Sequence, residues 1–400
     1  MDPSTARLIT SADGLSMIDS LPPYVEADAL TLGAGLRKAG ADAALVSAAM
    51  TQSRLRAAAR AKFGEFAAGM LFTQDGLEQA TRLAVAGLHA SRFRDAGCLA
   101  IADLTAGIGA DAMAASALGL AVVAFELDEA TALIADHNLR HWPETSVVHA
   151  DSIATLNTPG AVTKVGIDGI FADPARRNAR GRRHDPKDYS PALDDVLALR
   201  HIIPELGVKV GPAIDHDVIP GDVEAQWVSV DGAVVECALW CGKLASSAGH
   251  TALVIANGEA HHLAGDTERA PVGELAEYIY EADGAVIRAG LVGEVAKILG
   301  AHLIDPLIAY LACDAPVSTP FARGYRVLDS LPYSVKRLAA ALRERDVGIV
   351  DIKKRGIDIT PERLRPQLGL RGDAHATVIL TRIAGRHQAL IVEPLGHTPD

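Results

Sequence analysis

Cysteine and aromatic residues are both scarce in this chain of 400 residues. Its four cysteines, Cys98, Cys237, Cys241 and Cys313, are too few for a disulfide framework, and their spacing does not match the paired cysteines of a zinc site. We therefore expect reduced thiols in a cytoplasmic protein, and no metal site. Aromatic residues make up only 4% of the chain, so its core must consist mainly of Ala, Val, Leu and Ile.

Long apolar runs are also absent. The longest, such as residues 118–125, fall well short of the ~20 residues that a transmembrane helix needs. The N-terminus lacks the basic segment followed by an apolar stretch that marks a secretory signal. Neither a membrane span nor secretion is expected. Hydrophobic residues at 49% and charged residues at 22% are typical of a packed globular protein, and the length corresponds to roughly two to three domains.

The charge of the chain is unevenly distributed. A net charge of −12 argues against a nucleic-acid partner, because an acidic surface repels a phosphate backbone. Residues 321–400, however, contain 14 Lys and Arg against 9 Asp and Glu, whereas the preceding 320 residues contain 24 against 41. A basic C-terminal segment can bind a polyanion locally, so the composition permits RNA as a partner without requiring it.

Hydrophobic periodicity changes along the chain. Residues 26–92 have helical spacing, and the basic side chains of an alanine-rich stretch within them are expected to form a solvated face: Arg54, Arg56, Arg60 and Lys62. From about residue 97, short apolar runs alternate with helical segments, and strands are expected at residues 98–102, 121–125, 146–150 and 166–172. This alternation predicts an α/β fold with a parallel, doubly wound sheet.

The C-terminal half has a different pattern. Antiparallel strands are expected within residues 226–240 and 251–262, with Asp231-Gly232 as a hairpin turn, and residues 263–320 indicate mixed helix and loop. The end of the chain predicts helix, strand, helix and two strands, which is a small α+β domain. The predicted organisation is a helical N-terminal region (1–92), an α/β core (93–265), a connecting segment (266–320) and an α+β domain (321–400).

The segment from Asp103 to Ala112 carries the sharpest functional signal. Its glycines allow a tight turn between a strand and a helix and let a ligand approach the main chain closely. Gly107-x-Gly109-x-x-Ala112 also satisfies the dinucleotide-binding fingerprint. Asp103 distinguishes a turn that binds a dinucleotide from a turn that binds a positively charged ligand. A carboxylate at the strand end repels a pyrophosphate and favours a ligand that carries positive charge.

Acidic residues follow the next two predicted strands. Glu126 lies 23 residues after Asp103, where a carboxylate can accept hydrogen bonds from both hydroxyls of a ribose, and Asp128 is the nearby alternative. Asp151, just beyond the third strand, is placed to accept a hydrogen bond from an adenine amine. The sequence therefore predicts a nucleoside-binding edge of the sheet.

These motifs fall in an order and spacing that resemble the class I S-adenosylmethionine-dependent methyltransferases. The resemblance covers residues 70–262 and rests on the turn after Asp103, Glu126, Ala150-Asp151-Ser152 and Asp173-Pro174. It implies a Rossmann-like core with S-adenosyl-L-methionine as cofactor. The residues implied to bind the cofactor are Thr81, Asp103, Thr105, Ala106, Gly107, Gly109, Glu126 and Asp151.

A narrower resemblance is to bacterial methyltransferases that carry a THUMP-like C-terminal domain. It rests on four segments: Phe72-Thr73, Gly76 to Thr81, Phe171 to Arg177 and Ile352 to Gly356. THUMP domains are associated with RNA modification enzymes, so this resemblance implies an RNA substrate.

The fourth strand ends in a partial match to a catalytic motif. In methyltransferases that modify exocyclic amines of bases, an Asp/Asn-Pro-Pro-aromatic tetrapeptide stands here, and its acid and proline carbonyl accept hydrogen bonds from the amine. Asp173 and Pro174 match and are the predicted catalytic residues, whereas Ala175 and Arg176 replace the second proline and the ring. The acceptor pair is kept and the stacking ring is lost. A guanidinium can stack on a base or hold a phosphate instead.

Two groups of basic residues are predicted to contact RNA phosphates. The first follows the catalytic motif and consists of Arg176, Arg177, Arg180, Arg182 and Arg183, with Lys187 nearby. The second is Lys353, Lys354 and Arg355 in the C-terminal domain, with Arg343 and Arg345. We therefore expect methyl transfer to a base in RNA, with an exocyclic amine favoured. A non-catalytic module that binds cofactor and RNA, and methyl transfer to a small molecule or protein, remain as alternatives.

Overall fold

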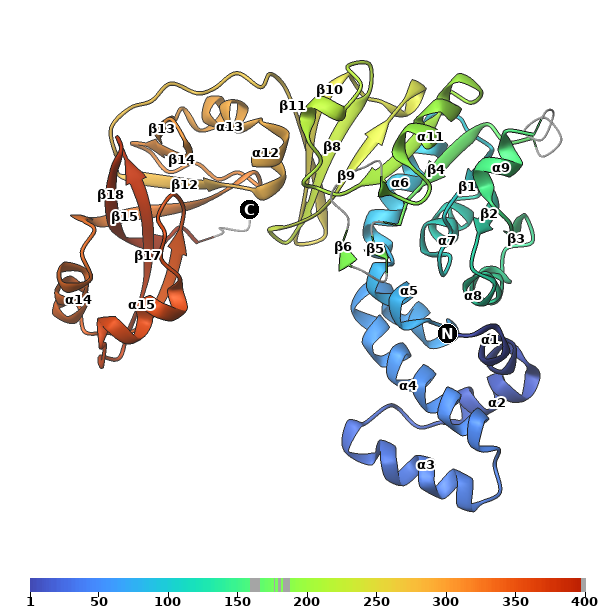
Figure 1. Cartoon of the computed structure of the whole chain (residues 1–400). Helices are drawn as coiled ribbons and strands as arrows, with labels where there is room; N and C mark the ends of the chain where they lie inside the picture. Colours follow the sequence, from blue (N-terminus) through green and yellow to red (C-terminus); the bar gives the residue numbers. More distant parts are fainter. Residues whose placement is uncertain (159–165, 176, 179–180, 183–187, 397–400) are drawn as a thin grey trace. The chain divides into compact units, whose positions relative to one another are not determined.

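The computed structural model describes residues 1–158, 166–175, 177–178, 181–182 and 188–396 of the chain (Figure 1). It divides into two compact units. Unit 1 consists of Met1–Val223 and Ala238–Ser247, and unit 2 of Glu224–Cys237 and Ala248–Asp400. Among the described helices, none has the length and apolar character needed to cross a membrane.

Unit 1 begins with the predicted helical region. Helical periodicity was recognised only from residue 26, whereas the first helix begins at Pro3, where Asp2 caps it by accepting a hydrogen bond from the Thr5 amide at 2.9 Å. Its helices are α1 (Pro3–Thr10), α2 (Ala12–Ser20), η1 (Glu26–Asp28), α3 (Ala29–Lys38), α4 (Ala43–Phe63), η2 (Gly64–Gly69), α5 (Gln74–Gln79) and α6 (Leu83–Asp95). α1 packs against α2 and against a helix of the sheet region, α8 (Glu129–Leu139), so the helical region is tied to the rest of unit 1.

The basic face of α4 is not uniformly solvated, and that expectation was wrong for two of its residues. The Lys62 ammonium is half-buried and donates hydrogen bonds of 2.7 to 2.8 Å to three backbone carbonyls within residues 77–80. The Arg56 guanidinium donates to the Met70 carbonyl at 2.8 Å. These contacts hold the segment that includes α5 against α4.

A parallel sheet forms the centre of unit 1, in the strand order β7-β4-β1-β2-β3. Strands β4, β1, β2 and β3 can be followed in Figure 1. The strands are β1 (Ala100–Asp103), β2 (Ala121–Glu126), β3 (Thr145–His149), β4 (Gly169–Ala172) and β7 (Leu206–Val210), with the end of β9 (Ala233–Trp240) next to β7. The remaining elements are α7 (Ala110–Ala117), α9 (Ser152–Leu156), β5 (Arg177–Asn178), β6 (Gly181–Arg182), α11 (Leu193–Ala198), η4 (Leu199–His201), η5 (His216–Val218) and η6 (Gly242–Leu244). The predicted parallel sheet and its helices are confirmed.

Unit 2 begins with the predicted hairpin and two further strands. The turn at Asp231 and Gly232, both with positive φ, joins β8 (Glu224–Val230) to β9. β10 (Gly249–Ala256) pairs parallel with β8 and antiparallel with β11 (Glu259–Ala264).

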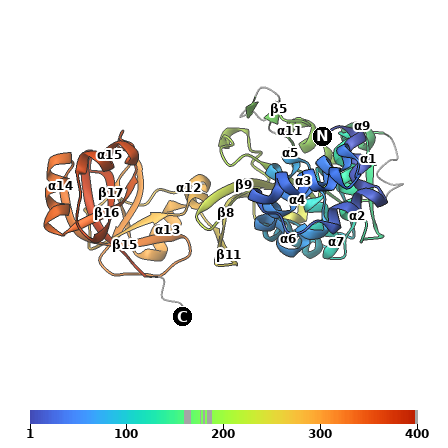
Figure 2. The ribbon, with the colours of Figure 1, turned by 90° about the horizontal axis from the view of Figure 1, so that it is seen from below.

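A seven-stranded sheet makes up the rest of unit 2, in the order β13-β14-β12-β15-β18-β17-β16. Its elements are β12 (Tyr278–Ala282), α12 (Gly284–Ala289), α13 (Val292–Leu299), β13 (His302–Asp305), β14 (Ile308–Cys313), β15 (Ala322–Pro332), α14 (Val335–Glu344), β16 (Val347–Lys354), α15 (Pro361–Leu368), β17 (Ala374–Ile383) and β18 (Arg386–Pro394). α14 and α15 pack together beside β16 (Figure 2). Their shared core includes Leu342, Leu364 and Val378. The predicted α+β pattern of the C-terminal end is confirmed.

The strands between residues 278 and 332 were not predicted from the sequence. Mixed helix and loop was expected for residues 263–320, yet β12, β13 and β14 belong to the same sheet as the C-terminal strands. These strands are short and mostly buried, and periodicity alone cannot distinguish such runs from buried helix. The domain boundaries at residues 93, 266 and 321 stay a prediction.

Candidate functional site

A cavity of about 930 Å³ opens in unit 1 at the carboxyl ends of β1, β2 and β4. Ligands of open α/β sheets bind at this edge, because the loops that follow the parallel strands meet there. All the predicted cofactor-binding residues except Gly109 line the cavity, namely Thr81, Asp103, Thr105, Ala106, Gly107, Glu126 and Asp151. Asp173, the predicted catalytic acid, lines it as well.

The two glycines of the turn after β1 have different roles. Gly107 has φ +54°, and nothing lies within 4 Å of where a Cβ would stand, so a ligand in the cavity can approach its main chain. Gly109 has φ +90° at the start of α7, and a Cβ there would lie 3.2 Å from the Leu139 side chain of α8. Gly109 therefore permits the close packing of α7 and α8 rather than lining the cavity.

Glu126 is the acid at the end of β2. Its Oε2 accepts a hydrogen bond from the Gly107 amide at 2.9 Å, and its Oε1 accepts one from the Asp128 amide at 2.8 Å. Burial raises the pKa of Glu126 above its ordinary value, against the effect of these two amides. Each oxygen keeps a further acceptor position, which fits the two hydroxyls of a ribose.

The other two acids predicted at this edge, Asp128 and Asp151, each cap a helix. Asp128 accepts a hydrogen bond from the Thr131 amide at 2.9 Å and starts α8, and Asp151 accepts one from the Ala154 amide at 2.9 Å and starts α9. Glu126 caps no helix, which favours it over Asp128 as the ribose acceptor.

Asp103 lies at the end of β1 and is only 2% exposed. It accepts a hydrogen bond from the Thr105 amide at 3.1 Å. Burial, followed by the nearby charge of Asp111, raises the pKa of Asp103 well above its ordinary value. A positively charged ligand group in the cavity would favour the ionised carboxylate, so the site fits the cationic, ribose-bearing cofactor that the sequence predicts.

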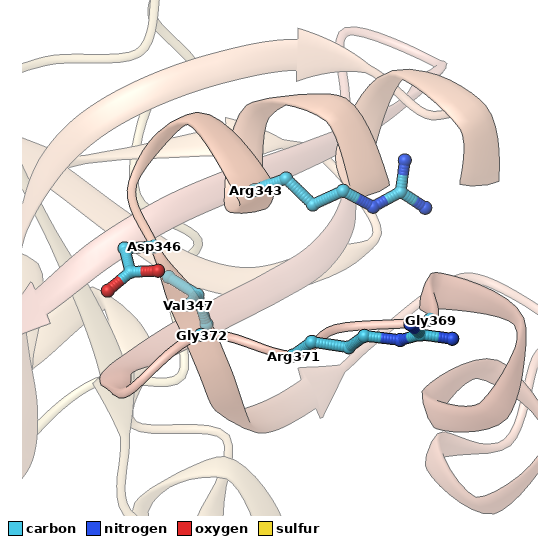
Figure 3. A pocket seen from close by; sticks show the side chains of 6 residues that line it. All are labelled: Arg343, Asp346, Val347, Gly369, Arg371 and Gly372. Atoms are coloured by element: carbon cyan, nitrogen blue, oxygen red, sulfur yellow. The ribbon is translucent and has the colours of Figure 1, made fainter.

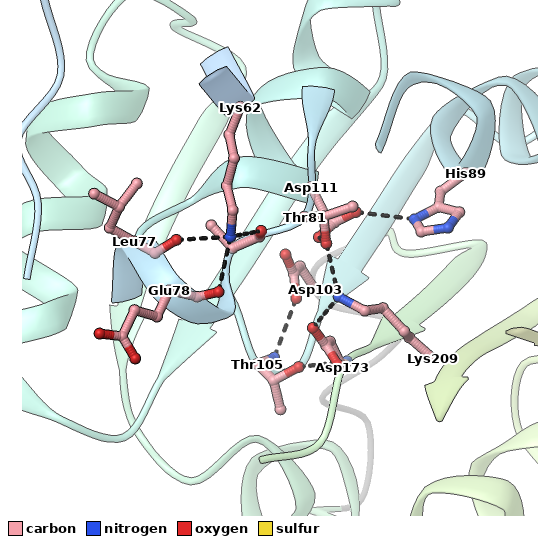
Figure 4. Close-up of polar contacts among 11 residues, drawn as sticks. Lys62, Leu77, Glu78, Thr81, His89, Asp103, Thr105, Asp111, Asp173 and Lys209 are labelled. Atoms are coloured by element: carbon pink, nitrogen blue, oxygen red, sulfur yellow. Dashed lines mark hydrogen bonds and ion pairs between the residues drawn. The ribbon is translucent and has the colours of Figure 1, made fainter. Parts of the chain in front are cut away.

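A chain of polar contacts, three of whose residues line the cavity, was not predicted from the sequence (Figure 4). The Lys209 ammonium, on β7, lies 2.6 Å from Asp173 Oδ2 and donates to Thr81 Oγ1 at 2.8 Å. The Thr81 hydroxyl in turn donates to Asp111 Oδ2 at 2.7 Å, and Asp111 Oδ1 lies 3.0 Å from His89 Nδ1. The Thr81 hydroxyl thus links two charged groups in addition to lining the cavity.

Asp111, the acid in this chain of polar contacts, lies in the first turn of α7. Burial would raise the pKa of Asp111, but the hydrogen bond and charge of His89, with the charge of Lys209, lower it overall. Asp111 is therefore held ionised next to Asp103.

A second link joins two segments at the cavity edge, because the Asp173 amide donates a hydrogen bond to Thr105 Oγ1 at 2.6 Å. The glycine turn and the end of β4 are fixed to one another.

The segment after Asp173 is only partly described. Pro174 is buried, and Ala175 forms a bridge with Ser190 through backbone hydrogen bonds of 2.9 and 3.2 Å. The backbones of Arg177 and Arg182 pair with each other in β5 and β6. Four of the predicted basic residues lie outside the described residues, namely Arg176, Arg180, Arg183 and Lys187. The substrate contacts of this arginine group stay a prediction.

The second basic group is largely engaged within unit 2. Lys353 Nζ lies 2.6 Å from Glu281 Oε2 and 5.7 Å from the ring centre of Tyr325. Burial lowers the pKa of Lys353, but its hydrogen bond to Glu281 raises it overall, so the ion pair persists. Arg355 lies over a second tyrosine ring, and Lys354 is exposed. Of these three predicted phosphate contacts, Lys354 is exposed, whereas Lys353 and Arg355 are partly buried.

Comparison with known families matches two parts of the chain. Residues 322–394 match the model of a family described as THUMP domain-like. Residues 2–59 match the model of a domain of unknown function.

Comparison with whole proteins gives relatives along most of the chain. Two proteins of Mycobacterium tuberculosis, from strains CDC 1551 and H37Rv, are each described as an uncharacterized S-adenosylmethionine-dependent methyltransferase. Each is 34% identical over 343 residues, which cover 82% of this chain and 90% of the relative. The crystal structure of a candidate methyltransferase from Porphyromonas gingivalis W83 superposes with a TM-score of 0.75 at 19% identity, over 94% of this chain and 100% of that one. The two chains share the fold.

Proposed function

This chain belongs to the S-adenosylmethionine-dependent methyltransferases, and we propose that it methylates a base in RNA, with an exocyclic amine as the acceptor. S-adenosylmethionine is its cofactor, and Asp103, Gly107 and Glu126 are the residues proposed to hold it. Bound there, the cofactor would supply a methyl group carried on a positively charged sulfur. The acceptor nitrogen would form the new bond to the methyl carbon, the electron pair of the carbon–sulfur bond would stay on sulfur, and the nitrogen would release a proton to solvent.

The placement of Asp173 is the observation that supports an amine acceptor. Its side chain is 24% exposed and lines the same cavity as the proposed cofactor residues. It follows β4 directly and precedes Pro174, as in the acceptor pair of enzymes that methylate base amines. A carboxylate here can accept a hydrogen bond from the amine and direct the nitrogen lone pair toward the methyl group.

This hydrogen bond would act mainly in the transition state. Positive charge develops on the nitrogen as the new bond forms, so a fixed carboxylate stabilises the transition state more than the bound substrate. The protein would contribute position and electrostatics without a covalent intermediate.

The C-terminal domain supports RNA as the substrate class. Its sequence matches a THUMP-like family model, and residues 321–400 carry an excess of basic residues. A cavity of about 460 Å³ opens there between α14, α15 and the start of β16 (Figure 3). It is lined by Arg343, Asp346, Val347, Gly369, Arg371 and Gly372.

Two guanidinium groups extend along this cavity. Figure 3 shows the side chains of Arg343 and Arg371 extending in the same direction, and the Asp346 carboxylate on the opposite side. One nitrogen of Arg343 donates to the Leu368 carbonyl at 3.0 Å, which fixes this side chain at the end of α15. Both arginines are exposed, and a phosphate between two guanidinium groups can accept several charge-assisted hydrogen bonds. We assign the RNA phosphate contact of unit 2 to this pair rather than to Lys353 and Arg355.

Mass spectrometry of nucleosides tests the proposed function. RNA from cells with and without the gene is digested, and the methylated nucleosides are compared. We expect one base-methylated species to be absent without the gene and restored by the wild-type chain, but not by Asp173→Ala. Identical nucleoside profiles in both strains would contradict RNA as the substrate.

A further inference from the structure

Lys209 is a buried lysine in a strand that is otherwise apolar. It stands fourth in β7, within Leu-Gly-Val-Lys-Val, and is only 5% exposed. An ammonium at such a position is costly unless charged and polar partners replace water. Its partners include Asp173 Oδ2 at 2.6 Å and Thr81 Oγ1 at 2.8 Å.

We propose that Lys209 is a positioning residue for methyl transfer, which holds the Asp173 carboxylate in the orientation that accepts the substrate amine. This inference rests on the proposed role of Asp173. Lys209 does not itself line the cavity, whereas Asp173 does. The ammonium therefore contacts Asp173 from the protein side and the substrate would contact it from the cavity. A carboxylate offers about four acceptor positions, so both donors can bind it together.

The charges around Asp173 explain why a cation is needed there. The carboxyl groups of Asp103 and Asp111 lie close by, and the charge of Asp173 contributes to the raised pKa of Asp103. Without a cation, repulsion among these acids would favour protonation of Asp173, and a protonated acid loses acceptor capacity. The ammonium of Lys209 offsets this repulsion.

The contacts of Lys209 also fix its own position. Thr81 accepts from Lys209 and donates to Asp111, whose other oxygen pairs with His89 (Figure 4). The His89 ring packs against Phe171 of β4 and Trp240, at ring-centre distances of 5.2 and 5.7 Å. A chain of hydrogen bonds thus connects the packed interior of unit 1 to the oxygen of Asp173, which is the arrangement expected of a support for a catalytic group.

Steady-state kinetics on single and double variants test the role of Lys209. The probe is labelled S-adenosylmethionine with whichever fraction of a gene-deleted extract accepts the methyl group, so the test holds for RNA and for any other acceptor. We expect Lys209→Met to lower kcat roughly 10- to 100-fold, because small displacements of a catalytic group have effects of this size. The KM for the acceptor and the Kd for the cofactor should change less than threefold.

A double-mutant cycle distinguishes action through Asp173 from an independent effect. Asp173→Asn combined with Lys209→Met should be no slower than Asp173→Asn alone, because Lys209 acts only through that carboxylate. Lys209→Arg, which keeps the charge, should recover part of kcat. Arg382→Met is the matched control: it breaks an ion pair of 3.1 Å with the buried Asp305 in unit 2 and should lower stability but leave kcat unchanged.

The outcomes separate this inference from the proposed function. Full kcat in Lys209→Met, with Asp173→Asn still impaired, would overturn the role of Lys209 and leave that of Asp173 intact. Multiplicative losses in the double variant, or a loss confined to cofactor affinity, would also overturn it. Full kcat in Asp173→Asn would instead refute the acceptor role of Asp173, and with it the positioning role of Lys209.

Discussion

The charged groups proposed to bind or act on substrate in unit 1 and in unit 2 differ in how far they are removed from water. In unit 1, Asp103 is 2% exposed and Lys209 is 5% exposed, and Asp173 extends from this group into a cavity of about 930 Å³. In unit 2, Arg343 and Arg371 are exposed beside a cavity of about 460 Å³. Buried charges interact strongly and are little screened by salt, whereas exposed charges are weakened by ionic strength.

This difference assigns separate tasks to the two units. The buried groups of unit 1 can fix the geometry and stabilise charge in a transition state, so changes there should affect turnover or cofactor affinity. The exposed arginines of unit 2 can contribute phosphate contacts, so changes there should affect RNA affinity in a salt-dependent manner. A substitution in unit 2 that slowed turnover at saturating RNA would contradict this separation of tasks.

The largest effect is expected from Asp173→Ala. Loss of one well-placed electrostatic partner in the transition state lowers turnover by about 100-fold or more. Cofactor affinity should change little, because the residues proposed to hold the cofactor remain. Single-turnover methyl transfer and calorimetry with S-adenosylmethionine measure the two quantities, and a loss seen in calorimetry alone would reassign Asp173 to cofactor binding.

The second-largest effect is expected from Glu126→Ala. Cofactor binding should weaken by roughly tenfold or more, which is the size expected for a lost hydrogen bond to a charged group. The expected loss is in affinity because the ribose is held before and during the reaction. Asp128→Asn is the matched control: asparagine also caps helices, so α8 and cofactor affinity should be preserved. Equal losses in both variants by calorimetry would contradict the assignment of Glu126 as the ribose acceptor.

Asp103 should make the cofactor-free protein less stable as pH rises. Its raised pKa means that the folded state keeps a proton which the unfolded chain releases above its ordinary value of about 4. Stability is therefore lost with increasing pH between the ordinary and the raised pKa. Asp103→Asn should remove this loss and raise Tm at neutral pH by roughly 2–4 °C, which corresponds to about 1 kcal/mol, while weakening cofactor binding. Thermal unfolding from pH 5 to 8 measures it, and an unchanged pH slope would contradict the effect.

A smaller effect is expected when Arg343 and Arg371 are both replaced by Ala. RNA binding should weaken severalfold across sequences, and the log–log salt slope should become shallower by about 0.7 for each lost phosphate contact on a single strand. Binding titrations at several salt concentrations measure this slope.

Lys353→Gln should have the smallest effect on the salt slope, because the ammonium is already paired with Glu281. It serves as the control for the arginine pair. A shallower slope for Lys353→Gln, with no change for the arginine variant, would reverse the assignment and return the phosphate contact to Lys353.

The sequence was sufficient to predict the acids at the edge of the cavity, but not the lysine that contacts one of them from within the protein. Parallel strands bring their carboxyl ends together, so the acids at the carboxyl ends of β1, β2 and β4, which are Asp103, Glu126 and Asp173, could be recognised from local pattern. Lys209 could not, since its partner Asp173 lies 36 positions away and nothing local marks the contact. The only local sign was a lysine within an apolar strand.

Contacts between distant segments also explain why the sequence pointed to Lys353, Lys354 and Arg355 rather than to Arg343 and Arg371 as the main basic group of unit 2. Lys353, Lys354 and Arg355 form a conspicuous cluster in sequence, but Lys353 is paired with Glu281, 72 positions away. Arg343 and Arg371 are far apart in sequence and meet only because α14 and α15 pack together. Clusters in sequence record composition, whereas a binding site depends on contacts between distant segments.

Transfer of labelled methyl groups by the purified chain tests the central claim most directly. The chain is incubated with labelled S-adenosylmethionine and with the RNA, protein and small-molecule fractions of a gene-deleted strain. We predict label in the RNA fraction, recovered on a base after digestion and reduced about 100-fold or more by Asp173→Ala. Label in the protein or small-molecule fraction, with none in RNA, would contradict the account.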